Sequence, residues 1–330
     1  MPNNSPFFLQ QSSVRSVMLR VALALIPGIA AYVWFFGAAI LVQLSLATIT
    51  ALLAEAGMLK LRGKPIWLFV SDGSVVVTAW LIALAFPPIG PWWLVVVATL
   101  FAVVLVKHLY GGLGQNPFNP AMGAFALMIV AFPQLMSQWP APEFTDFSMQ
   151  LNLIFGTREL DAVTMATPLD ALRSMLHTGT ESASAPSGSG MIAGHGWEWI
   201  ATGYLLGGLW LVQQRIITWH IPVAFLATLA LIAAIFTIVD ADRFAGPLFH
   251  LFGGGAMLCA FFIATDPVSA SSTPNGKLIY AAAIGVLTWV IRNFGAFPDG
   301  VAFAVLLLNI CVPLIDMHTQ PTVFGHKNKP

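Results

Sequence analysis

Long apolar runs separated by short polar breaks are the feature that most constrains this chain. Hydrophobic residues make up 58% of its 330 positions and charged residues only 8%, whereas a soluble domain carries about 25% charged residues. A membrane-spanning helix needs about 20 apolar residues, or fewer where the helix is broken and other protein segments satisfy its backbone. The sequence therefore predicts an all-α polytopic membrane protein with about ten transmembrane helices.

The apolar segments fall into two sets of five, on either side of a long polar stretch. They cover residues 21–36, 38–58, 74–86, 92–106 and 121–135, then 199–214, 221–239, 248–264, 278–291 and 301–315. Polar or Gly-rich breaks occur at corresponding places, with SDGS at 71–74 before one short segment and GGG at 253–255 within another. Such paired breaks are typical of duplicated transporter-like folds, and an odd number of spans per repeat predicts two inverted five-helix repeats.

Positively charged residues predict the orientation, because Lys and Arg concentrate in cytoplasmic loops. With the N-terminus inside, most of the 14 Lys and Arg residues fall on the cytoplasmic side. The ones that fall outside are Arg158, Arg173, Arg243 and Arg292. We therefore expect an inner-membrane protein with cytoplasmic termini (1–20 and 318–330), membrane repeats at 21–136 and 199–317, and a periplasmic loop at 137–198.

Charge and cysteine content argue against several kinds of partner and site. The formal net charge is zero and the pI is about 7.1, so bulk electrostatics does not indicate binding to nucleic acid. Both cysteines lie in apolar runs, where a thiol behaves as a small hydrophobe. The sequence predicts neither a disulfide nor a metal site, and no residue is assigned a catalytic role.

The long polar stretch contains a segment that can open a helix, DAVTMATPLD at residues 161–170. Thr167 is a good N-cap residue, Pro168 suits the first helical position, and Asp170 follows three residues after the cap. This spacing predicts a helix over residues 169–177. Judged by local spacing alone, capping explains these residues without any chemistry.

Polar residues at the membrane breaks have both structural and functional interpretations. Asn116 and Asn119 flank two prolines that remove backbone donors. Their amides either satisfy freed backbone groups or line a polar pocket. Capping or turn formation explains Asp72, Asp266 and Asp299, although carboxylates within a membrane are often functional.

Several charged and aromatic residues are expected to have structural roles. Glu55 lies near a predicted cytoplasmic end and is expected to be solvated. Lys107 and His108 end a helix on that side, where positive charge is favoured, and are not assigned to catalysis. Trp139 and Trp197 are expected to mark the membrane interface and packing.

Several of these segments together resemble a known family of membrane proteins. The segments are SDGS at 71–74, GGLGQNPFNPA at 111–121, the loop motif ending at 167, ATDPVSA at 264–270 and NGK at 275–277. The family is the NqrB/RnfD family, whose members are membrane components of Rnf electron-transport complexes and of sodium-translocating NADH:quinone reductases. The resemblance covers nearly the whole chain, so it is far more specific than the loop motif alone.

The resemblance implies a covalent flavin. In the family, a loop motif Asp-x-x-Ser/Thr-Gly-Ala-Thr carries FMN through a phosphodiester to its last Thr, attached by a separate Mg²⁺-dependent transferase that uses FAD. Asp161, Thr164, Ala166 and Thr167 match this motif, which implies FMN on Thr167 with Asp161 and Thr164 as further cofactor-site residues. Met165 stands where the motif has glycine. A glycine there would allow a closer backbone approach or a positive φ.

The resemblance also implies an activity and partners. A noncovalent riboflavin is associated with the homologous protein, which makes Asn116 and Asn119 candidate pocket residues. The implied function is an electron relay in an Rnf complex, with subunits A, B, C, E and G, that links redox exchange between ferredoxin and NAD to movement of Na⁺ or H⁺. By fold alone, a secondary transporter or channel is an alternative, since inverted repeats with broken helices occur there too. A structural anchor for redox partners is a third.

Overall fold

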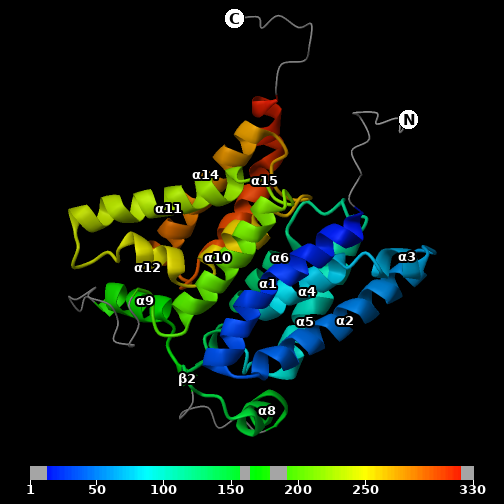
Figure 1. Cartoon of the computed structure of the whole chain (residues 1–330), viewed down its shortest axis with the longest axis horizontal. Helices are drawn as coiled ribbons and strands as arrows, with labels where there is room; N and C mark the ends of the chain where they lie inside the picture. The colour runs from blue at the N-terminus through cyan, green and yellow to red at the C-terminus, as the bar shows by residue number, and fades with distance from the viewer. Residues whose placement is uncertain (1–12, 157–163, 179–191, 321–330) are drawn as a thin grey trace, which may run out of the picture.

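A computed structural model of the chain describes residues 13–156, 164–178 and 192–320. Within these ranges nearly all of the regular secondary structure is helical, with one small two-stranded ladder (Figure 1). Asp161 of the loop motif lies outside the described residues.

The helices follow the chain in two groups, separated by the segments around Thr167. The first group is α1 (Val14–Phe36), α2 (Ala39–Leu61), α3 (Ile66–Val70), α4 (Ser74–Ala85), α5 (Trp92–Leu100), the π-helix η1 (Phe101–His108), α6 (Pro120–Ala131) and α7 (Pro133–Met136). Between the groups lie β1 (Trp139–Pro140), α8 (Phe147–Phe155), β2 (Thr164–Met165) and α9 (Pro168–Thr178). The second group is α10 (Trp197–Gln213), α11 (His220–Val239), α12 (Pro247–Phe252), α13 (Ala256–Leu258), the π-helix η2 (Cys259–Ile263), α14 (Pro274–Phe294) and α15 (Val301–Thr319).

Each predicted apolar segment is helical over most of its length. In the described part of the chain, five helices are long and apolar enough to cross a membrane, namely α1, α2, α11, α14 and α15. Shorter apolar helices run over Ser74–Ala85, Trp92–His108 and Pro120–Ala131. The prediction of an all-α polytopic membrane protein is confirmed.

Two of the predicted segments are broken. The segment at 121–135 divides because Pro133 has no N–H to continue the helix, so α6 ends at Ala131 and α7 begins at Pro133. The segment at 248–264 divides into α12, α13 and η2. The break between α12 and α13 includes Gly254 at φ +61°, a conformation that glycine adopts without steric cost.

The two groups contact each other through matching helices. α1 packs along α10 and α6 contacts α15, while α2 contacts α4 and α5 much as α11 contacts α12 and α14. Close approach at the first pair depends on glycine, since a Cβ on Gly207 would overlap the carbonyl group of Ala24. A duplicated arrangement would produce this pairing. The inverted orientation and the limits of the two repeats stay predictions.

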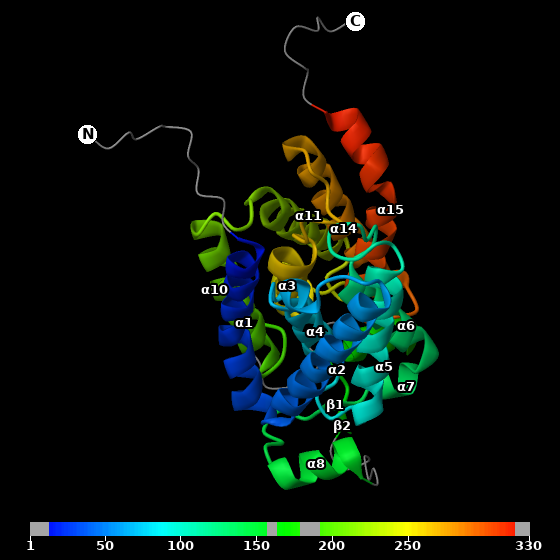
Figure 2. The ribbon, with the colours of Figure 1, turned by 90° about the vertical axis from the view of Figure 1, so that its right-hand side faces the viewer.

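The ends of the described chain and the Thr167 segment lie on different sides of the bundle. Figures 1 and 2 show the start of α1 and the end of α15 toward one side, with α8 and the β-ladder at the other. This relative placement agrees with the predicted sidedness. The identity of the membrane and the absolute orientation stay predictions.

The α8 helix closes the ends of α1 and α2 on the side of the β-ladder. The buried Gln150 side chain accepts the N–H of Ala39 at 2.9 Å and donates to the carbonyl oxygens of Phe36 at 2.9 Å and Phe144 at 2.6 Å. The first two of these groups belong to helix ends, which lack partners inside their own helices. One glutamine therefore joins the polar loop to the membrane helices.

One expectation about charge is wrong, because Glu55 is buried rather than solvated. Glu55 is 2% exposed. Its carboxylate accepts hydrogen bonds from Lys107 Nζ at 3.0 and 3.1 Å and lies 2.9 Å from His108 Nε2. The end of η1 places both basic residues against α2. A buried charge is tolerated where it is paired and hydrogen-bonded.

Candidate functional site

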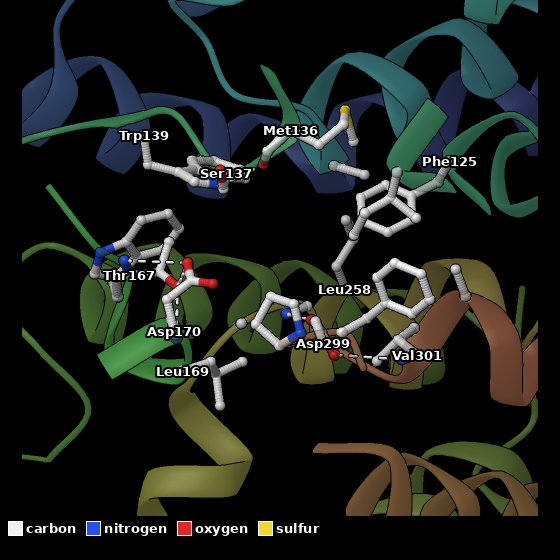
Figure 3. A pocket seen from close by; sticks show the side chains of 18 of the residues that line it. Phe125, Met136, Ser137, Trp139, Thr167, Leu169, Asp170, Leu258, Asp299 and Val301 are labelled. Carbon is white, nitrogen blue, oxygen red and sulfur yellow. Dashed lines mark hydrogen bonds between the residues drawn. The ribbon is translucent and has the colours of Figure 1, made fainter. Parts of the chain in front are cut away.

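Thr167 lies immediately before α9 and caps it, as the local spacing predicts. Its Oγ1 accepts the N–H of Asp170 at 3.1 Å, and its hydroxyl donates to Asp170 Oδ2 at 2.6 Å (Figure 3). The same Oδ2 accepts the N–H of Thr167 at 3.3 Å. These reciprocal bonds form a capping box that holds both side chains in place.

A short antiparallel ladder holds the segment before Thr167 against the end of the first helical group. Trp139 pairs with Met165, and Pro140 pairs with Thr164. Met165 lies in the extended β2 strand and is 51% exposed. The positive φ that a motif glycine would permit is therefore not used here, and the loop accommodates a side chain at this position.

Thr167 lines a cavity of about 430 Å³ between the two helical groups, within the range of about 300–1,000 Å³ that is usual for small-molecule sites. The walls are mainly apolar, and their aromatic members are Tyr32, Phe125, Trp139, Trp197, Tyr204 and Phe297. Charged side chains at the lining are Asp170, Arg173 and Asp299. In Figure 3, Trp139 and Ser137 face Thr167 and Asp170 across the cavity. An apolar cavity with a few polar groups is suited to binding an organic ligand.

A second, more open hollow adjoins the same loop. Its lining residues are Gln134, Ser137, Gln138, Thr164, Met165, Ala166 and Asp170. Since Asp170 lines both spaces, the Thr167–Asp170 pair lies between an apolar cavity and a polar hollow. The Oε1 atom of Gln138 is buried without a hydrogen-bond partner, which leaves an acceptor for a ligand that carries hydroxyl donors.

The Asp170 carboxylate has an unusual electrostatic environment for a capping residue. Burial raises the pKa of Asp170 and outweighs the lowering by hydrogen bonds from Thr167 and by the positive charge of Arg173. The negative charge of Asp299 raises this pKa further. The carboxylate is consequently a stronger base than an exposed aspartate.

An ion pair between Arg292 of α14 and Asp299, just before α15, holds Asp299 in the wall of the cavity. Arg292 Nη2 donates to Asp299 Oδ1 at 3.1 Å and to the carbonyl oxygen of Gly253 at 3.1 Å, and Nη1 donates to that of His250 at 2.6 Å. Asp299 Oδ2 accepts the N–H of Gly255 at 2.7 Å. This pair ties the α12–α13 break to α15.

The carboxylates at the breaks have the capping or turn roles that local spacing predicts. Each carboxylate accepts a hydrogen bond from the backbone N–H group two residues later in the chain: Asp72 from Ser74 at 2.7 Å, Asp266 from Val268 at 3.3 Å and Asp299 from Val301 at 3.3 Å. Only Asp299 among these three also lines the cavity beside Thr167.

Asn119 and Asn116 satisfy backbone groups at the start of α6. Asn119 Oδ1 accepts two N–H groups of the first turn of α6 at 3.0 and 3.1 Å, and its Nδ2 donates to the carbonyl oxygen of Ile263 at 3.2 Å. Asn116 Nδ2 donates to the carbonyl oxygen of Phe118 at 2.8 Å. Neither residue lines the two spaces described above, and a role for either in a flavin pocket stays a prediction.

Most of the cavity wall could not be recognised from the sequence. Trp139 and Trp197, expected to serve the interface and packing, form part of the wall with ring centroids 5.0 Å apart. Tyr32 comes from α1 and Tyr204 from α10. These residues are far apart along the chain, so no motif spacing joins them. For Arg173, the only local signal was its place in the short helix that Thr167 opens.

The fold and the cavity define a polytopic membrane protein that presents a threonine hydroxyl at a ligand-sized space between two groups of helices. The model of the NQR2, RnfD, RnfE family matches residues 1–325, and the chain belongs to this family.

The most similar relatives include three proteins that carry the same name, the D subunit of the ion-translocating oxidoreductase complex. The one from Aliivibrio salmonicida is 49% identical over 344 residues, with 98% of each chain covered. Those from Yersinia pseudotuberculosis and Escherichia fergusonii are 48% and 46% identical, again with 98% of each chain covered. The resemblance inferred from the motifs is confirmed.

Proposed function

We propose that this chain is the RnfD-type subunit of an Rnf ion-translocating oxidoreductase complex, and that it holds FMN through a phosphodiester to Thr167. The observation that carries the proposal is the Thr167 hydroxyl at the lining of a ligand-sized cavity, in a chain of this family. The flavin, when bound, supplies the electron-transfer chemistry, and the protein supplies its position and surroundings.

The start of α9 suits a phosphodiester. The dipole at a helix N-terminus favours a negative charge there. Arg173 of the same helix also lines the cavity, and its Nε is buried without a hydrogen-bond partner. A phosphodiester oxygen would give this donor an acceptor. These features support Thr167 as the attachment point.

The two spaces beside Thr167 fit the two parts of a flavin nucleotide. The aromatic walls of the cavity suit a flat, largely apolar ring system and exclude water from it. The polar hollow, with the unpaired Gln138 acceptor, suits a hydroxylated chain. Asp170, which accepts the Thr167 hydroxyl, lines both spaces.

The family implies further parts of the same proposal. Asp161 and Thr164 would help a flavin transferase to recognise the loop, and a noncovalent riboflavin would bind near Asn116 and Asn119. The complex would include subunits A, B, C, E and G in the bacterial inner membrane, with the Thr167 loop periplasmic and the termini cytoplasmic. The chain would relay electrons while the complex couples redox exchange between ferredoxin and NAD to movement of Na⁺ or H⁺.

Intact mass and in-gel flavin fluorescence of the denatured protein test the attachment. The full chain is expressed with and without a Mg²⁺-dependent flavin transferase, as wild type, Thr167→Val and Thr202→Val. Thr202 is the matched control, because it lines neither space beside Thr167 and its hydroxyl donates to the carbonyl oxygen of Glu198 within α10 at 2.7 Å. With the transferase, we expect the mass of an FMN phosphodiester and a fluorescent band in the wild type and in Thr202→Val, and neither in Thr167→Val.

Wild-type protein without flavin, despite a transferase that labels another substrate, would overturn the attachment proposal. Solute flux through the purified chain in liposomes would then test the transporter or channel alternative, which the broken helices permit.

A further inference from the structure

We propose that Asp170 is the general base that takes the hydroxyl proton of Thr167 when the flavin is attached. This inference rests on the attachment site proposed above. It assigns part of the chemistry of modification to the acceptor chain itself rather than to the transferase alone.

The geometry is that of an activated nucleophile. The Thr167 hydroxyl donates to Asp170 Oδ2 at 2.6 Å, within the reach required of a general base. The N–H of Asp170 donates to Thr167 Oγ1 at 3.1 Å and occupies one of its two lone pairs. The proton therefore points at the carboxylate, and the second lone pair is left for attack. Figure 3 shows the two side chains directed toward each other at the cavity wall.

The carboxylate is held in place and made more basic by its surroundings. The N–H of Thr167 donates to the same Oδ2 at 3.3 Å, which orients the group. Burial raises the pKa of Asp170, and the charge of Asp299 adds to this effect against the opposing charge of Arg173. A base whose pKa lies closer to the working pH transfers protons more effectively.

The proposed step balances without oxidation or reduction. Thr167 Oγ1 attacks the phosphorus on the FMN side of the pyrophosphate of FAD, which the Mg²⁺-dependent transferase presents. The Oγ1–P bond forms, the P–O bond to the AMP part breaks, AMP leaves, and the hydroxyl proton passes to Asp170. Protonation also removes the repulsion that a carboxylate would exert on a phosphodiester so close to it.

The Asp170→Asn variant distinguishes the proposed role of Asp170 as a base from its role in capping α9. An Asn side chain still offers an oxygen to the Thr167 hydroxyl, but it cannot take a proton at neutral pH. Asp146 is a matched control in the same loop, because it caps α8 by accepting the N–H groups of Ser148 and Met149. Asp146→Asn makes the same chemical change away from the reactive hydroxyl.

The experiment measures the initial rate of flavin attachment to the full chain in detergent, with purified transferase, FAD and Mg²⁺, from about pH 4, near the ordinary pKa of an aspartate, to about pH 9. We expect Asp170→Asn to be labelled about 100-fold more slowly than wild type or more, and Asp146→Asn to match the wild type. The wild-type rate should rise with pH and level off, whereas the Asp170→Asn rate should lack this rise.

Each other outcome has a definite meaning. Equal rates and pH profiles for wild type and Asp170→Asn would overturn the inference and leave the base in the transferase, with the attachment proposal intact. An unlabelled wild type would overturn the attachment proposal itself. If Asp170→Asn takes up no flavin, Asp170→Glu decides. A labelled Glu variant supports the base, and an unlabelled one with wild-type melting temperature refutes it.

Discussion

Replacing Arg292 with methionine tests how the Asp299 wall of the cavity is held. The guanidinium is fully buried and donates to Asp299 and to the carbonyl oxygens of His250 and Gly253. The change leaves two carbonyl acceptors unpaired, at about 1–3 kcal/mol each, and removes the counter-ion of a carboxylate. Because the Asp299 side chain is 21% exposed, water partly solvates its carboxylate and reduces the cost of losing the counter-ion. We expect the free energy of unfolding to fall by about 3–5 kcal/mol, the range for breaking a buried ion pair.

The assay is reversible unfolding of the purified chain in mixed micelles, followed by tryptophan fluorescence. Arg15→Met is the matched control, since Arg15 is exposed, and its free energy of unfolding should change by less than about 0.5 kcal/mol. The double variant Arg292→Met/Asp299→Asn should lose about 1–3 kcal/mol less than the sum of the two single losses, because no unpaired charge is left. A loss below about 1 kcal/mol in Arg292→Met, or strictly additive losses, would refute this account of the wall.

Three other perturbations use the same unfolding assay or limited proteolysis. Lys107→Met should lower the free energy of unfolding by about 3–5 kcal/mol, because it leaves the buried Glu55 carboxylate without its lysine partner. The matched change at an exposed lysine, Lys60→Met, should leave it nearly unchanged. Gly207→Ala should cost about 1–3 kcal/mol through overlap with the α1 backbone, while Gly57→Ala, with open space around it, should be neutral or stabilising. The raised pKa of Asp170 means that the folded loop binds this proton more tightly than the unfolded chain, so its contribution to stability is lost as pH rises. The α9 segment should therefore resist proteolysis better at about pH 4, near the ordinary pKa of an aspartate, than at about pH 8 in wild type. Asp170→Asn should lack this pH dependence, and an unchanged dependence in the variant would contradict the effect assigned to Asp170.

Features that depend on residues close together in the chain could be predicted from the sequence. The membrane class and the positions of the helices follow from hydropathy, because a bilayer requires backbone hydrogen bonds to be satisfied within apolar helices. The cap at Thr167 and the helix after it follow from three residues at a fixed spacing. The broken second-group segment was visible in its glycines at 253–255.

The surroundings of Thr167 were decided by the tertiary structure. The cavity joins residues of α1, α6, α10 and α15 with the loop, and its Asp299 wall depends on an arginine of α14. The burial of Glu55 has the same origin, since its partners Lys107 and His108 come from another helix. Hydropathy and motif spacing describe only the neighbours of a residue within its own segment of the chain. Burial, pairing and the pKa of a carboxylate depend on the segments packed against it, and the fold alone brings those together.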